Sequence, residues 1–255
     1  MNAKKICTLM GQRIAEILWD NPPSLYLSGS CVLEDFRPGW SDIDILVLTK
    51  EEISGEAAQK LLMLRQSMQG ETGEAAFRSL EGAMLSAQAL RQGYPTRVVY
   101  WGTSGQRISD HYALDSFSRW LLLKKGELLL GEDRRMGFCL PTHEEFLGDI
   151  RHHYETIRNY AQKTGGNLYA FGWMLDIARC LYTLQRDEVI SKTQAGEWAL
   201  REGLCPEKAV MEEVLRIRGD PEAAVRDADT MFWAKEMGPH VQKFADVLEA
   251  YLAEE

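Results

Sequence analysis

Two aspartates that precede and enter an apolar segment constrain this chain more than any other feature. An apolar segment at residues 25–27 runs into Gly29-Ser30, and a second one at residues 43–48 follows Asp42 directly and contains Asp44. Both segments have the length and composition of buried strands. Because alternate residues of a strand point to the same face, Asp42 and Asp44 are expected to project together.

The neighbouring carboxylates predict a bound cation. Two like charges at the edge of an apolar core raise the free energy of the fold unless a cation neutralises them. A pair of this spacing is common by chance and often lies in a solvated turn, but here a Gly-Ser turn precedes it between two strands. Backbone amides in such a turn can hold phosphate. Asp42 and Asp44 are therefore predicted to bind a divalent metal that carries a nucleoside triphosphate.

The same residues resemble a known signature. Gly29-Ser30 together with Asp42-Ile43-Asp44 is similar to the signature of the polymerase-beta-type nucleotidyltransferase superfamily. The wider segment 25–49 resembles the aminoglycoside adenylyltransferases that modify streptomycin and spectinomycin. The resemblance implies an N-terminal mixed-sheet catalytic domain, a C-terminal helical domain and a substrate between them. The signature is specific to the superfamily and leaves the acceptor substrate open.

Composition argues against several other classes. The net charge of -9 does not favour sequence-independent nucleic-acid binding, which needs basic surfaces, and it suits a cationic substrate better. The five cysteines are scattered and form no C-x-x-C pair, which is typical of free thiols in a reducing compartment. No apolar run has the length of a signal peptide or a membrane span. We therefore expect a cytoplasmic protein that binds neither nucleic acid nor membrane, of unknown oligomeric state.

Hydrophobic periodicity predicts an α+β fold. Helices are expected over residues 7–18, 56–69 and 114–125, and strands over 25–27, 43–48, 76–86, 96–101 and 127–130. After Pro141 only amphipathic helices are expected, over 144–163, 168–185, 192–202, 206–218, 221–233 and 239–252. Thr142 and Glu145 have the spacing of a capping box. We predict a mixed-sheet nucleotidyltransferase domain at residues 1–135, followed by an all-helical clamping domain at residues 136–255.

The resemblance also implies a third carboxylate that acts as metal ligand, general base, or both. Glu81 is the candidate, because it is the acid within the apolar segment 80–85 and is followed by Tyr94-Pro95, as in the adenylyltransferases. The alternative is an exposed strand residue with a solvated side chain.

These residues give a scheme for transfer. Two Mg²⁺ ions are expected to bridge Asp42, Asp44 and the triphosphate, with Glu81 as a third metal ligand. The amides of Gly29 and Ser30 and the Ser30 hydroxyl are expected to hold phosphate oxygens, with Ser41 adding a hydroxyl to the same network. Glu81 would take the proton of the acceptor hydroxyl.

Two cations of the helical domain are expected to contact the triphosphate. Arg179 lies in a mainly apolar helix, where a buried cation needs a partner, and Lys192 follows Ser191 at a helix start. Their separation of thirteen residues resembles that of an arginine and a lysine in the family. The alternative is a structural ion pair with Asp176 or Glu197.

The acceptor is less constrained. The resemblance implies an acid for the cationic drug near the start of the helix that bears Arg179. Here the corresponding positions are Asn167, Leu168 and Tyr169, none of them acidic, and Asp176 is a possible replacement.

Three functions stay open after the sequence analysis. The leading hypothesis is a Mg²⁺-dependent enzyme that transfers AMP from ATP to a hydroxyl of a small molecule, with an aminoglycoside antibiotic, and hence antibiotic resistance, as the first candidate. The alternatives are an enzyme that adenylylates a protein side chain and a nucleotide-binding regulator that has lost turnover.

Overall fold

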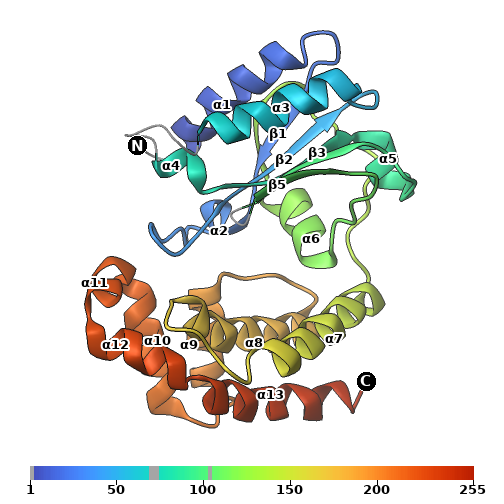
Figure 1. Cartoon of the computed structure of the whole chain (residues 1–255). Helices are drawn as coiled ribbons and strands as arrows, with labels where there is room; N and C mark the ends of the chain where they lie inside the picture. Colours follow the sequence, from blue (N-terminus) through green and yellow to red (C-terminus); the bar gives the residue numbers. More distant parts are fainter. Residues whose placement is uncertain (1–2, 69–74, 103–104) are drawn as a thin grey trace. The chain divides into compact units, whose positions relative to one another are not determined.

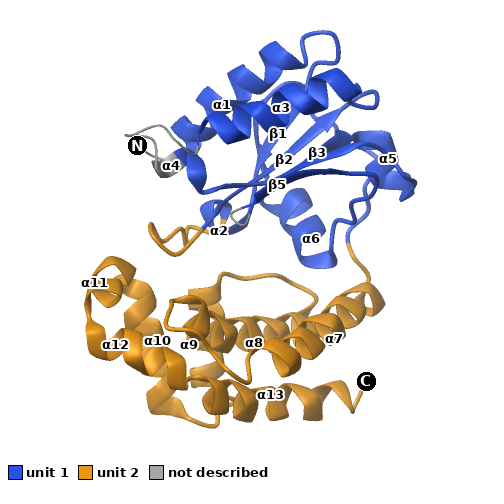
Figure 2. Cartoon of the chain, viewed as in Figure 1, with its two compact units in different colours: residues 1–32, 42–140 blue, residues 33–41, 141–255 orange. Residues whose placement is uncertain are grey.

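The chain divides into two compact units. The computed structural model describes residues 3–68, 75–102 and 105–255 (Figure 1). The sheet unit comprises Met1–Val32 and Asp42–Leu140, and the helical unit comprises Leu33–Ser41 and Pro141–Glu255 (Figure 2). The predicted α+β class, with a mixed sheet followed by helices, is confirmed. The segment Leu33–Ser41 groups with the helical unit although it lies between the first two strands in sequence.

The sheet unit is built on a six-stranded sheet of order β5-β4-β3-β2-β1-β6. Its strands are β1 Ser24–Leu27, β2 Ile43–Thr49, β3 Leu80–Ser86, β4 Val98–Gly102, β5 Gly105–Ser109 and β6 Glu127–Leu130. β2 and β3 are parallel, and the other neighbouring strands are antiparallel. A parallel pair needs a crossover connection, which here is formed by α3 Gly55–Ser67 and α4 Ala75–Arg78.

Each face of the sheet has its own cover. α1 Ala3–Ile17 and α3 lie on one side, and α6 Ser116–Lys124 lies on the other (Figure 1). Leu46, Leu48, Ala83 and Leu85 form the buried cluster that includes Leu122 of α6. Because side chains alternate along a strand, the same face of β2 and β3 continues toward the strand starts as Asp44 and Glu81. The predicted functional acids therefore extend an apolar row.

Several predicted elements differ from the structure. The strand expected from residue 76 is wrong at its start, because residues 75–78 form the helical turn α4. The guanidinium of Arg65 on α3 donates to the carbonyls of Phe77 (2.6 Å) and Arg78 (2.8 Å) at the end of α4, where carbonyls have no donor within the helix. α5 Ala87–Gln92 and β5 were not predicted. The predicted end of the helix at Gln69 lies outside the described residues.

The helical unit is arranged around α8 Tyr169–Arg186, whose side chains are buried along most of its length. The other helices are α7 His143–Tyr160, α9 Lys192–Arg201, α10 Lys208–Gly219, α11 Pro221–Arg226, α12 Ala228–Trp233 and α13 Gly238–Leu252. The predicted capping box of Thr142 and Glu145 is present at the start of α7. The single helix predicted over 221–233 is divided, because Asp227 leaves the helical conformation and its side chain accepts from the Thr230 amide.

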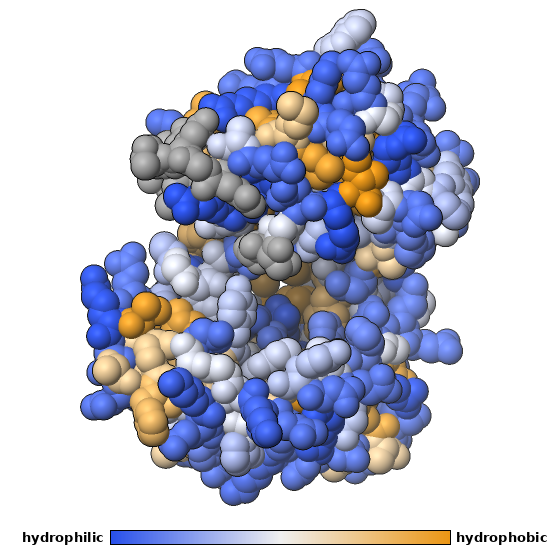
Figure 3. Space-filling view, viewed as in Figure 1, coloured by the Kyte–Doolittle hydropathy of each residue, from blue (hydrophilic) through white to orange (hydrophobic). Residues whose placement is uncertain are grey.

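The visible face of each unit is mainly hydrophilic (Figure 3). An apolar patch covers the region of α11 and α12, where Val225 and Phe232 are exposed large apolar residues. Among the described helices, none combines the length and the apolar character that crossing a bilayer requires.

Arg65 is expected to stabilise the sheet unit. Arg65→Met keeps much of the side-chain volume but leaves the carbonyls of Phe77 and Arg78 without their donor, so the free energy of unfolding should fall by about 3 kcal/mol. Urea denaturation followed by far-UV circular dichroism measures the loss. Lys60→Met is the control, because Lys60 on the same helix makes an exposed ion pair with Glu56, and its effect should stay within about 0.5 kcal/mol. Equal midpoints for the two variants would contradict this role.

Candidate active site

The parallel pairing of β2 and β3 brings the predicted acids together. Asp44 and Glu81 are direct partners in this register, so their side chains project side by side from one face of the sheet. Asp42 lies two residues before Asp44 and is half-buried like it. Gly82, next to Glu81, has φ +154°, and a Cβ there would lie 1.8 Å from the Ile45 carbonyl oxygen. Glycine at this position permits the close approach of the two strands beside the acids.

The Gly-Ser turn lies against the Asp44 carboxylate. Residues 29–32 form the helical turn α2 directly after β1, and the Ser28 amide donates to the Asp44 carbonyl at 2.9 Å. Gly29 has φ +61°, and a Cβ there would lie 1.7 Å from Asp44 Oδ2. Only glycine leaves room for this contact. The turn therefore lies directly beside the Asp44 carboxylate, as the sequence spacing predicted.

Tyr100 on β4 reaches the candidate base. Its hydroxyl donates a hydrogen bond to Glu81 Oε1. The Tyr100 ring lies against the Arg107 guanidinium, whose carbon is 4.3 Å from the ring centroid. Burial raises the pKa of Tyr100, and the hydrogen bond to Glu81 adds to the increase. Tyr100 therefore stays protonated at neutral pH and can act as a donor that orients Glu81.

Other buried groups define the electrostatics around the acids. Arg65 is only 2% exposed; burial lowers its pKa, and the charges of Glu81 and Asp42 oppose that decrease. Burial also raises the pKa of Tyr112 to about 12, with further contributions from the charges of Asp115, Asp44 and Glu81. A buried guanidinium thus offsets part of the negative charge that the carboxylates bring together.

Sequence reasoning did not identify Arg65 or Tyr100. Arg65 lies four residues after Leu61 and so falls on the buried stripe of its helix, a spacing that marks it as an inward-facing cation. The position of Tyr100 carries no comparable signal, because it depends on the register between β3 and β4.

The donor set fits a magnesium ion that arrives with a nucleotide. Within the described residues, no three or more His, Cys, Asp or Glu side chains are arranged as a metal site. Mg²⁺ in nucleotide enzymes is usually held by one or two carboxylates plus substrate phosphates, so Asp42 and Asp44 suffice on the protein side. The buried Ser30 hydroxyl has no hydrogen-bond partner among the described residues, as expected for a group that contacts a ligand. A third ligand role for Glu81 stays a prediction.

Ser41 lies beside Asp42 in the chain but is engaged in its own loop. Its hydroxyl oxygen accepts from the Arg37 amide at 3.1 Å. The predicted contribution of this hydroxyl to phosphate binding is not tested by the structure.

The two predicted cations of the helical unit share one acid. Asp176 accepts from Arg179 Nη2 and is paired with Lys192 Nζ, both at 3.0 Å. Burial opposes ionisation of Asp176, but the charges of Lys192 and Arg179 lower its pKa overall. Burial likewise lowers the pKa of Lys192, and Asp176 opposes the decrease. The ion pair with Asp176, which the sequence analysis gave as the alternative, is therefore present. It brings Arg179 and Lys192 together around one carboxylate.

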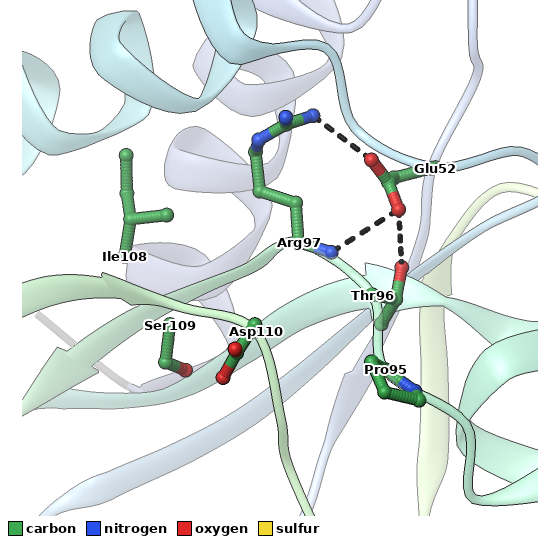
Figure 4. A pocket seen from close by; sticks show the side chains of 7 residues that line it. All are labelled: Glu52, Pro95, Thr96, Arg97, Ile108, Ser109 and Asp110. Atoms are coloured by element: carbon green, nitrogen blue, oxygen red, sulfur yellow. Dashed lines mark hydrogen bonds and ion pairs between the residues drawn. The ribbon is translucent and has the colours of Figure 1, made fainter.

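A separate cavity of about 620 Å³ lies near the opposite strand ends (Figure 4). It is lined by Glu52, which follows β2, and by residues 95–97 and 108–110. Asp44 and Glu81 lie at the starts of their strands, so this cavity is distinct from the carboxylate cluster. Two of its charged groups already pair with each other, since Arg97 Nη1 lies 3.0 Å from Glu52 Oε1.

Each unit contains a segment that matches a known domain family. Residues 13–75 match a nucleotidyltransferase domain, and residues 143–231 match the C-terminal domain of aminoglycoside adenylyltransferases. The first match includes the Gly-Ser turn and both aspartates, and the second includes Arg179 and Lys192.

A solved structure has the same fold. The spectinomycin adenyltransferase from Enterococcus faecialis, determined with ATP and spectinomycin, aligns with a TM-score of 0.63 at 14% sequence identity. The alignment covers 95% of this chain and 98% of that chain. No curated protein matches the chain by sequence. From the two domain matches and the shared fold, we conclude that the chain is a nucleotidyltransferase that resembles the aminoglycoside adenylyltransferases.

Proposed function

We propose that the protein transfers AMP from ATP to a hydroxyl group of a small molecule and depends on Mg²⁺ for this reaction. The observation that carries the proposal is the register of β2 and β3, which sets Glu81 beside Asp44 on the face where Gly29 contacts the Asp44 carboxylate. The proposed base, one of the two proposed metal ligands and the glycine of the proposed phosphate turn thereby lie together in one unit. The structural relative determined with ATP supports ATP as the nucleotide.

Each residue has a role in the proposed reaction. Glu81 accepts the proton of the acceptor hydroxyl, and Tyr100 orients the Glu81 carboxylate through its hydrogen bond. The acceptor oxygen forms a bond to the α-phosphorus of ATP while the bond from that phosphorus to the pyrophosphate oxygen breaks. The products are the adenylylated acceptor, pyrophosphate and a protonated Glu81, which returns its proton to solvent. Gly29 and Ser30 hold phosphate oxygens of the nucleotide.

Asp42 and Asp44 would hold the metal. When bound, Mg²⁺ neutralises the charge that develops on the departing pyrophosphate. The contact between Gly29 and Asp44 would keep a metal held by the aspartates next to the phosphate turn.

Arg179 and Lys192 are proposed to add positive charge to the triphosphate. Both side chains are partly exposed, at 22% and 28%, so each has surface available to a ligand while it is paired with Asp176. Phosphate carries more negative charge than one carboxylate, so a triphosphate can compete for these cations.

The acceptor is proposed to be a hydroxyl-bearing cation such as an aminoglycoside antibiotic. The related enzyme was determined with spectinomycin, and the net charge of -9 favours a cationic molecule. The first turn of α8 contains no acid, so drug binding through that turn, as the family resemblance implied, is not available here.

Asp44→Asn is expected to abolish transfer while leaving the fold intact, because the amide cannot supply a full negative charge to the metal. Pyrophosphate release in the presence of Mg²⁺, ATP and a panel of aminocyclitols measures the reaction. Glu52→Gln is the matched control, since it removes another carboxylate near the opposite strand ends, and it should keep wild-type activity. Full activity of Asp44→Asn would remove the metal assignment.

Glu81→Gln separates an enzyme from a regulator that only binds nucleotide. The side chain keeps its shape and can still pair with Tyr100, but it can no longer accept a proton, so transfer should fall about a hundredfold or more. Binding of Mg-ATP, measured by calorimetry, should remain close to the wild-type value. An unchanged transfer rate would refute the base assignment, and a wild-type chain that binds ATP without any turnover would favour the regulator.

Lys192→Ala tests the phosphate contact of the helical unit. Loss of a cation aimed at the triphosphate should weaken ATP affinity by about tenfold. The comparison is Asp176→Asn, which breaks the same ion pair but leaves both cations. A contact to phosphate predicts weaker binding for the lysine variant alone, whereas a purely structural ion pair predicts that both variants lose stability and bind ATP equally well.

A further inference from the structure

The segment Leu33–Ser41 joins the two parts of the proposed nucleotide site within the sequence. It begins directly after α2, which contains Gly29 and Ser30, and it ends directly before Asp42. A displacement of this segment would therefore act on the phosphate turn at one end and on the metal ligands at the other. By its contacts, however, the segment groups with the helical unit.

Asp35 fixes the first half of the segment. It is 3% exposed, and Arg218 at the end of α10 is 2% exposed. The Arg218 guanidinium donates to Asp35 Oδ2 from Nη2 at 2.7 Å and from Nε at 3.2 Å. Thr193 adds its amide to Oδ2 at 3.2 Å and its hydroxyl to Oδ1 at 2.6 Å. Arg37 donates to Oδ1 at 3.2 Å.

The second half of the segment contacts Arg218 as well. The Arg218 guanidinium carbon lies 5.1 Å from the centroid of the Trp40 ring, which is itself buried. The Ser41 amide donates to the Arg37 carbonyl at 2.8 Å, and the Ser41 hydroxyl accepts from the Arg37 amide. Arg218 therefore contacts both halves of the segment.

The surroundings of Asp35 favour its ionised form. Burial opposes its ionisation, but the hydrogen bonds from Thr193 and Arg218 lower its pKa overall. A buried ion pair is weak evidence for stability, because apolar side chains of similar volume often stabilise as well or better. The use of such pairs that is best supported in other proteins is to specify one arrangement of the chain.

The elements that hold the segment also carry the proposed phosphate cations. Thr193, whose amide and hydroxyl bind Asp35, follows Lys192 directly on α9. Lys192 in turn shares Asp176 with Arg179 of α8. The anchor of the segment and the cations are therefore linked through two neighbouring residues of α9, Lys192 and Thr193.

We infer that the buried Asp35–Arg218 pair is a positioning pair that sets the phosphate turn and the metal aspartates for nucleotide binding. This inference rests on the proposed function. It assigns a task in nucleotide binding to residues of the helical unit that do not themselves touch the nucleotide.

The test compares ATP affinity with stability. Asp35→Asn keeps the shape of the side chain but removes the charge that faces Arg218, so Mg-ATP affinity, measured by calorimetry, should fall about tenfold or more. The double variant Asp35→Asn with Arg218→Gln also removes the unpaired buried charge. It should regain thermal stability relative to the single variant and still bind Mg-ATP weakly.

The matched control is Asp246→Asn, which removes one partner of Arg158 in an ion pair of the helical unit that does not involve Leu33–Ser41. Its Mg-ATP affinity should equal that of the wild type. A second readout is the rate of chymotryptic cleavage after Trp40, which is buried against Arg218; this rate should rise in Asp35→Asn and stay unchanged in the control.

The outcomes separate the two proposals. If the wild-type chain does not bind Mg-ATP, the proposed function fails. If it does bind, and the double variant binds equally well or in proportion to its stability, the positioning role alone is overturned and the pair serves only the fold.

Discussion

The parallel pairing of β2 and β3 is the interaction on which the candidate site depends. Its register places Asp44 beside Glu81, and the close approach of the strands requires Gly82. The pairing in turn needs a crossover, and Arg65 holds the end of that crossover through the carbonyls of α4. The guanidinium that fixes the connection also lies near enough to Asp42 and Glu81 to offset their charge. One buried residue thus supports both the sheet and its acids.

Each unit balances its own functional charges. In the sheet unit, Arg65 and the Tyr100 hydroxyl act on Glu81, while the turn at Gly29 lies against Asp44. In the helical unit, a single aspartate is shared between two cations. Such pairing keeps buried charges tolerable without a ligand, because an unpaired buried charge has a large desolvation cost. In the proposed function, phosphate and metal add to these partners.

The strongly periodic elements could be predicted from the sequence. α8 begins and ends within one residue of its predicted range, and the predicted capping box marks the start of α7. Weak signals failed where a tertiary contact decides the local structure. α4 is a helical turn whose terminal carbonyls are held by Arg65, and the short strand β5 is an edge strand that pairs only with β4. Such short elements carry too few residues for a hydrophobic period to be recognised.

By itself, the sequence determined which functional groups make up the candidate site. They are a glycine turn, two aspartates on one strand face, and a single acid in another apolar strand. It did so because strand alternation fixes which side chains share a face without knowledge of the partner strand. Only the tertiary structure decided that Glu81 pairs with Asp44, that Tyr100 reaches Glu81, and that residues 33–41 are anchored by Arg218. These facts depend on strand register and on contacts across 183 residues, which no local pattern encodes.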